Sequence, residues 1–141
     1  TENLTGREQL QTIFKSNLES QTARALDGIV DEYEQDAGFI LTMMRDNLRI
    51  GAPVVSDIIK KGMADGSIQT QYPDQAAEVF LLLVNFWMNE TVFESDPEKL
   101  PERIHFLQFM MTSIGMDIFD DELMQLFSQK NKAQKKAIGQ N

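Results

Sequence analysis

The chain of 141 residues contains no cysteine and only one histidine, His105. Without cysteine there are no disulfide bonds, zinc–thiolate sites or thiol nucleophiles, which agrees with a reducing cytoplasm. Glu102 and His105 form a single E-x-x-H pair, whereas the di-iron four-helix proteins use this pair twice. We therefore predict no metal and no cofactor, and we interpret His105 as a residue of a helix surface or an interface.

The sequence also lacks the short motifs of common catalytic sites. It holds no G-x-S-x-G elbow, no G-x-x-x-x-G-K-[ST] phosphate loop and no G-x-G-x-x-G turn. No serine or threonine has a histidine base beside it in the sequence. We therefore predict that the protein is not an enzyme.

Long hydrophobic runs and an excess of positive charge are missing too. The longest apolar run, Val79 to Met88, contains Asn85 and has about half the length of a membrane span. No signal peptide opens the chain, so we predict no membrane partner and a cytoplasmic location. The net charge of −9 repels the phosphate backbone, which indicates that this chain does not grip nucleic acid by itself.

What is present is a helical period. The chain is 42% hydrophobic, its apolar residues recur at spacings of three and four, and no run alternates with period two long enough for a strand. This pattern predicts one all-α domain over residues 1–141, a helical bundle of six or seven helices. The first helical region, residues 6–34, begins with the capping-box pair Thr5 and Glu8 and forms either one long helix or two.

Glycine and proline divide the rest of the chain. Gly51-Ala52-Pro53 predicts a boundary between a helix around residues 39–48 and a second one that ends at Asp65-Gly66. Pro73 predicts the start of a helix that lasts to about Phe93. Helices restart near Pro101 and after residues 120–122.

The helix predicted from Pro73 to Phe93 is apolar almost all round. Such a helix must be covered on every side, and a domain of this size has few other helices with which to cover it. Asn85 and Asn89 lie one turn apart among its apolar stripes, and buried amides need hydrogen-bond partners. The excess apolar surface therefore indicates a subunit partner, a bound molecule or both.

Two stretches resemble the C-terminal regulatory domain of TetR-type transcriptional repressors. They are the helix end I-I-x-x-G-M-A-D-G-S-I over residues 58–68 and the proline-led P-D-Q-A-A-E-V-F-L-L-L-V-N over residues 73–85. Residues 4–10 look like the helix that joins the DNA-binding head to the regulatory body, so the resemblance covers nearly the whole chain. It departs from the family at Tyr72-Pro73-Asp74, where the usual aspartate-proline start is shifted.

The helix-turn-helix head of that family is absent from the sequence. The chain begins at Thr1 instead of a methionine, which favours removal of an upstream head over a regulatory domain that stands alone. DNA would then be bound only through the missing N-terminal domain.

The resemblance implies a homodimer that senses a small, mostly apolar effector and thereby shifts the spacing of the DNA-binding heads. The last major helix pair, residues 74–93 and 101–119, would form an intersubunit four-helix bundle. The dimer interface predicted on this basis consists of Phe80, Leu83, Ile104, Leu107, Met111 and Ile118. The predicted ligand-binding residues are Phe39, Met43, Met63, Phe86, Trp87, Asn89 and Met110, with Asn89 as the orienting polar group.

The sequence leaves two choices open. One is which apolar stripe faces the pocket and which faces the second subunit. The other is between the repressor domain and two further hypotheses, a free-standing helical homodimeric interaction protein and a metal-dependent helical-bundle enzyme.

Overall fold

The computed structural model describes residues 3–26, 36–90 and 92–137, and the side chains of these except 21–26 and 130–137. Its α-helices are α1 (Gly6–Leu26), α2 (Ala37–Asp46), α3 (Ala52–Asp65), α4 (Pro73–Leu82), α5 (Leu100–Ser113) and α6 (Asp121–Ala137). Two π-helical segments, η2 (Asn47–Gly51) and η3 (Leu83–Trp87), and a 3₁₀ turn, η4 (Pro97–Lys99), complete the order. The described part of the chain contains no strand, which confirms the all-α prediction.

Local sequence signals set most helix ends. The capping box is confirmed: the Thr5 N–H donates to Glu8 Oε1 at 3.0 Å, and the Glu8 N–H donates to Thr5 Oγ1 at 3.1 Å. The carboxylate of Asp36 accepts from the N–H of Phe39 and caps α2. Gly66 ends α3 in the left-handed conformation at φ 85°, which costs a glycine little.

Two predicted boundaries differ from the structure. The chain does not break at Gly51, because α2 continues through η2 into α3 as one helical stretch from Ala37 to Asp65. Pro53 is tolerated since it lies in the first turn of α3, directly after the π segment η2, where the regular hydrogen-bond ladder is already interrupted. The helix that begins at Pro73 ends with η3 at Trp87, short of the predicted Phe93, so Asn89 follows the helix instead of lying on it.

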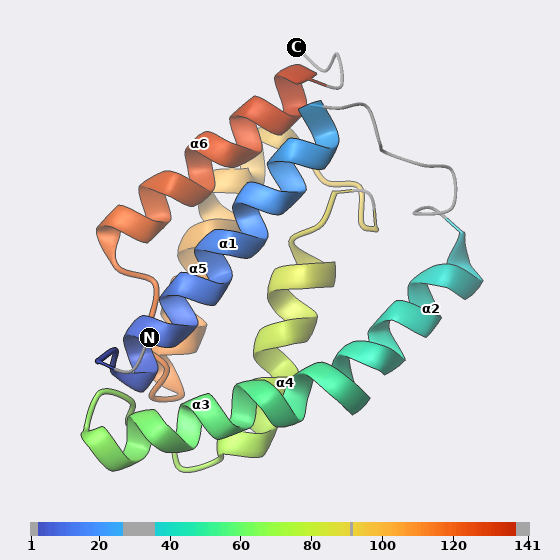
Figure 1. Cartoon of the computed structure of the whole chain (residues 1–141). Helices are drawn as coiled ribbons and strands as arrows, with labels where there is room; N and C mark the ends of the chain where they lie inside the picture. The colour runs from blue at the N-terminus through green and yellow to red at the C-terminus, as the bar shows by residue number, and fades with distance from the viewer. Residues whose placement is uncertain (1–2, 27–35, 91, 138–141) are drawn as a thin grey trace.

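The core forms where α1 is packed between α3 and α6 (Figure 1). Leu10, Phe14 and Leu18, spaced by four residues, bury one face of α1. The Phe14 ring meets Phe119 edge-on at a centroid distance of 5.0 Å and Phe127 of α6 at 5.4 Å. An aromatic centre therefore joins the first helix to the last, while α4 and α5 close the core with Phe80, Ile104, Leu107 and Met111.

Helix α2 is the exception to this packing. It runs away from the body of the bundle (Figure 1), and none of its residues is buried although five of its ten are large and apolar. Only its continuation through η2 packs against α4. The residues that follow α1 and precede α2, 27–35, lie outside the described part of the chain, and they include the end of the first predicted helical region, residues 27–34.

Candidate functional site: an asparagine chain beside an apolar hollow

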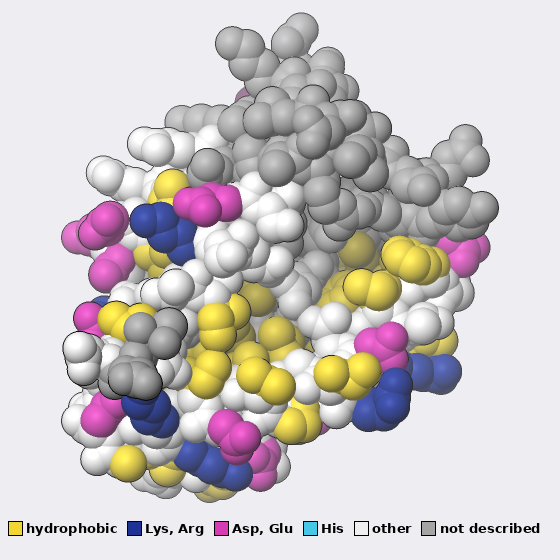
Figure 2. Space-filling model, in the orientation of Figure 1, with side chains coloured by type: hydrophobic (Ala, Val, Ile, Leu, Met, Phe, Trp, Pro, Cys, Tyr) yellow, Lys and Arg dark blue, Asp and Glu magenta, His cyan; other side chains and the backbone are white. Residues whose placement is uncertain are grey.

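Hydrophobic side chains gather in a hollow on one face of the molecule. Figure 2 shows them between α1 and α3, over α4, and again along α2. Among the described residues with large exposed apolar side chains are Ile13 of α1, Phe39 and Met43 of α2, and Ile50 and Val54 at the junction with α3. Apolar surface gathered in a concavity is typical of ligand sites in helical domains.

Three asparagines from three helical segments form a hydrogen-bonded chain in this region. Asn17 Nδ2 of α1 donates to Asn85 Oδ1 of η3 at 2.8 Å, and Asn85 Nδ2 donates to Asn47 Oδ1 of η2 at 2.7 Å. Asn47 Nδ2 in turn donates to the carbonyl of Met43 at 2.9 Å. All three amides are half-buried, so the chain satisfies polar groups that would otherwise be costly.

Both π segments of the described chain carry one of these asparagines. Asn47 opens η2 and Asn85 is the middle residue of η3. A single π turn within an α-helix is rare and is frequent at functional sites. The hydrogen bond from Asn85 to Asn47 joins the two segments, and η2 also packs on α4, since a Cβ placed on Gly51 would be 3.3 Å from the Leu81 side chain. The side-chain amides of Asn47 in η2 and Asn85 in η3 therefore face each other.

The structure brings together only some of the predicted ligand-binding residues. Phe39 and Met43 lie on α2, each 41% exposed, and the carbonyl of Met43 ends the asparagine chain. Phe86 is buried beside Asn85 in η3. Asn89, placed just past the helix, donates to the carbonyl of Asn85 at 3.4 Å. Of these four residues, Met43 and Asn89 make hydrogen bonds with the asparagine chain.

Three other predicted ligand-binding residues lie elsewhere. Met63 is near the C-terminal end of α3, about 16 Å along the helix from Ala52, and so at the far end from the asparagine chain. Trp87 turns toward α5, where its ring packs on Phe106 at a centroid distance of 6.1 Å. Met110 lies on α5 itself and is half-buried. Helical spacing in the sequence does not show that Trp87 faces α5 while Asn85 faces the other two asparagines.

Sequence reasoning missed Asn17 and Asn47. Each is a single amide in an otherwise ordinary helical pattern, and only the packing of α1 against η3 and η2 makes them partners of Asn85. The sequence signal for both residues is an amide beside apolar residues on a helix, the same signal that singles out Asn85 and Asn89.

Most residues of the predicted dimer interface lie in the interior of the single chain. Phe80, Ile104, Leu107, Met111 and Ile118 are buried inside the single chain, where they form its core. A side chain with no exposed surface has nothing to present to a second subunit. Leu83 is half-buried and packs against the same core. The apolar stripe of α5 therefore belongs to the fold of one chain.

The opposite face of α5 carries the exposed aromatic residues. Phe109 is 68% exposed and Phe106 is 50% exposed, and their rings lie 6.5 Å apart. Arg103 lies next to them: its guanidinium is 4.4 Å from the centre of the Trp87 ring and donates to the Trp87 carbonyl. We call the set of Trp87, Phe106 and Phe109 the aromatic patch.

A separate cleft of about 250 Å³ lies between α3 and α4 and is lined largely by charged and polar side chains. The Ser56 hydroxyl donates to Asp74 at 2.5 Å, and Lys60 Nζ lies 3.4 Å from the same carboxylate. The Ser56 hydrogen bond and the Lys60 charge lower the pKa of Asp74. Ser56 and Lys60 of α3 therefore both contact Asp74 of α4, and these contacts join the two helices.

Metal and membrane sites have no counterpart in the part of the chain that the structure describes. No group of three or more histidine, aspartate or glutamate side chains there is arranged to hold a metal ion. His105 is exposed on α5. Over the same residues, no helix has both the length and the apolar character needed to cross a membrane.

Comparison with known proteins gives one match. A family model described as "Tetracyclin repressor-like, C-terminal domain" matches residues 34–110, which is more than half of the chain. The matched stretch includes α2, both π segments, α3 and α4, and most of α5. No curated protein and no solved structure matches the chain.

Proposed function

Since the chain belongs to the family of tetracyclin repressor-like C-terminal domains, we propose that it is the effector-sensing and dimerisation domain of a transcriptional repressor. A regulator of this kind acts where the DNA is, in the cytoplasm. The observation that carries the proposal is the family match over residues 34–110, which include α2, α3, α4 and two of the three asparagines of the chain.

The effector site in this proposal is the apolar hollow between α1, α3 and α4, with α2 along one side. Phe39, Met43, Phe86 and Asn89 remain its proposed ligand-binding residues. Asn17, Asn47 and Asn85 join them as the polar groups, because a mostly apolar site fixes its ligand through a few placed polar atoms. Met63, Trp87 and Met110 are left out of the site because they lie on other surfaces.

The dimer in this proposal uses the aromatic patch on the outer face of α5. Exposed phenylalanines are costly in water and are enriched at the centres of protein interfaces together with tryptophan and arginine. A stable homodimer through this face needs on the order of 1,600 Å² of buried surface, so exposed groups of neighbouring elements would have to join α5 in the interface. Two copies of α5 and one further helix from each chain would then make an intersubunit four-helix arrangement.

The mechanism is a shift between two arrangements of these helices. The N-terminal end of α1 leads toward the position from which a DNA-binding head would be held, so a displacement of α1 changes the spacing of two heads in the dimer. An effector drives this change only by its difference in affinity for the two arrangements.

Two substitutions on α5 test the dimer. Phe109→Glu places a charge in the aromatic patch, and we expect folded monomer at micromolar concentration in sedimentation experiments, where the parent chain is a dimer. Leu107→Glu places the charge in the core instead, so we expect unfolding visible by circular dichroism. A parent chain that sediments as a folded monomer would refute the dimer.

The effector role has its own test. Native mass spectrometry of the purified protein is expected to show an apolar molecule carried through purification or, after its removal, uptake of such molecules with a rise in Tm. If no apolar compound from a broad fragment set raises the Tm, the sensing role is refuted whatever the state of the dimer.

A further inference from the structure

The hydrogen bonds of the asparagine chain all run in one direction. Asn85 and Asn47 each accept through Oδ1 and donate through Nδ2, and the chain ends on a backbone carbonyl, that of Met43. At the other end, Asn17 donates, and no described group donates to its Oδ1. Each link pairs one donor with one acceptor. A molecule that enters between two links must therefore replace both an acceptor and a donor, or leave an amide unpaired.

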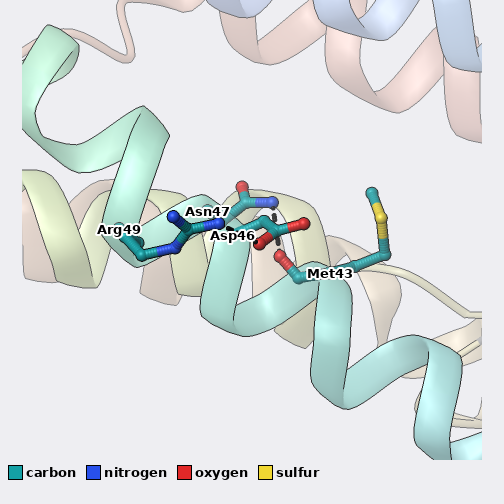
Figure 3. Close-up of polar contacts among 4 residues, drawn as sticks. All are labelled: Met43, Asp46, Asn47 and Arg49. Atoms are coloured by element: carbon teal, nitrogen blue, oxygen red, sulfur yellow. Dashed lines mark hydrogen bonds and ion pairs between the residues drawn. The ribbon is translucent and has the colours of Figure 1, made fainter.

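The surroundings of the chain favour an uncharged group. The three side chains are neutral, and the nearest charges along η2 belong to Asp46 and Arg49, which pair with each other at 3.2 Å (Figure 3). Figure 3 also shows the Asn47 amide turned back to the Met43 carbonyl next to this ion pair. An anionic or cationic head group placed beside the three amides would lose its hydration, and the described charges of Asp46 and Arg49 already pair with each other.

The link between Asn17 and Asn85 is the part of the asparagine chain that reaches α1. Asn85 and Asn47 lie in the two π segments, and η2 also packs against α4 through Gly51 and Leu81. Asn17 is the only one of the three asparagines on α1, and its hydrogen bond of 2.8 Å ties α1 to η3 next to the buried Phe14 and Leu18. A ligand group inserted at this link would therefore change the contact between α1 and η3 while the core packing of α1 remains.

We propose that the hydrogen-bonded chain of Asn17, Asn85 and Asn47 recognises the effector, and we call these three residues the asparagine clasp. The ligand class is a neutral apolar molecule that carries a group with one donor and one acceptor, such as an amide or a lactam. This group inserts between Asn17 and Asn85, accepting from Asn17 Nδ2 and donating to Asn85 Oδ1, and it thereby separates α1 from η3. The proposal rests on the effector-sensing function above and specifies its ligand and its switch.

A pair of matched probes tests the ligand class. Acetanilide and phenyl acetate have nearly the same shape, but only acetanilide offers an N–H donor. In a titration of the full chain followed by NMR, acetanilide should shift the side-chain amide signals of Asn17 and Asn85 in a saturable way. Phenyl acetate should bind at least fivefold more weakly, because it leaves Asn85 Oδ1 unpaired. Equal affinity for the two probes, or no shift of these two amides, would overturn the proposal.

Variants show whether the discrimination comes from the clasp. Asn85→Leu should bind both probes equally, and Gln11→Leu, which removes an amide of α1 that donates to the Ile118 carbonyl outside the site, should keep the preference for acetanilide. If Asn85→Leu does not fold, Asn17→Leu replaces it, since that residue lies at the end of the chain. A preference that survives in the folded clasp variant would contradict the proposal.

Hydrogen exchange tests the switch. Saturation with acetanilide should speed amide exchange in residues 15–20 and 83–87 while residues 6–10 stay unchanged. Uniform slowing over all these residues would mean that the ligand is read without opening the clasp and would overturn the switch. Effector sensing itself fails separately: in that case no apolar compound, with or without an amide, raises the Tm.

Discussion

The two ends of α1 are attached to the protein by contacts of different kinds. At the N-terminal end, the backbone of α1 touches the backbone of α3: a Cβ on Gly6 would lie 2.3 Å from the nitrogen of Gly62. The Gly6 N–H donates to Asp65 Oδ2 at 2.9 Å, and the Arg7 N–H donates to Ser67 Oγ at 3.1 Å. We call this contact the α1–α3 joint.

The polar contacts farther along α1 are made by side chains alone. Gln11 Nε2 donates to the Ile118 carbonyl at 2.9 Å, and Asn17 Nδ2 donates to Asn85 Oδ1 at 2.8 Å, beside the buried Phe14 and Leu18. A side chain can change its rotamer and its partner, whereas two backbones in contact separate only if a helix moves. The α1–α3 joint is therefore the rigid end of α1, and the asparagine clasp is the contact that a ligand would replace.

The largest effect is expected at the joint. Gly6→Ala forces a methyl group into the backbone of α3, and we expect a loss of about 2–3 kcal/mol of stability in urea unfolding, as for overpacked cores. Gly38→Ala is the matched control on α2, where the added Cβ meets only a side-chain oxygen at 3.2 Å, and its effect should stay within about 0.5 kcal/mol. Equal losses in the two variants would show that the joint is not a close backbone contact.

A smaller difference should separate two carboxylates. Asp65 accepts from the backbone N–H groups of Gly6 and Ser67 at the joint, whereas Asp46, beside the clasp, pairs with the exposed Arg49. Asp65→Ala should lower the urea midpoint, and Asp46→Ala should leave it nearly unchanged, since exposed ion pairs contribute little. If Asp46→Ala destabilises the protein as much as Asp65→Ala, the expected difference between the two carboxylates is contradicted.

The smallest expected effect is a pH dependence of the joint. Hydrogen bonds from Ser67 and from the Gly6 backbone hold the pKa of Asp65 below its ordinary value of 3.8. A lowered pKa in the folded state stabilises the protein above the unfolded value, and this contribution is lost as the pH falls through the folded value. Stability should therefore decline below about pH 4 in the parent chain.

Asp65→Asn is the control for this decline. It removes the titrating group, so the stability of this variant should fall less steeply below about pH 4. Thr5 lowers the pKa of Glu8 in the same way, so part of the decline should persist in this variant. Identical pH profiles for the parent chain and Asp65→Asn would exclude Asp65 as a contributor.

Much of the fold followed from local sequence. The Thr5–Glu8 capping box, the glycine that ends α3 and the proline that opens α4 act within a few residues of themselves, so their effect can be read along the chain. The π segments could not be read in this way. A π turn differs from an α turn by one inserted residue, and only packing against a neighbour decides which forms.

The sequence by itself determined that the chain is helical, that it has more apolar surface than one small core needs, and that it resembles a known regulatory domain. Only the tertiary structure decided which apolar stripe is core: Leu107 and Met111 face inward, and Phe106 and Phe109 face outward. The reason is physical. Helical spacing fixes which residues share a face, but the direction of that face depends on what α1 and α6 cover, and so do the partners that Asn85 finds in Asn17 and Asn47.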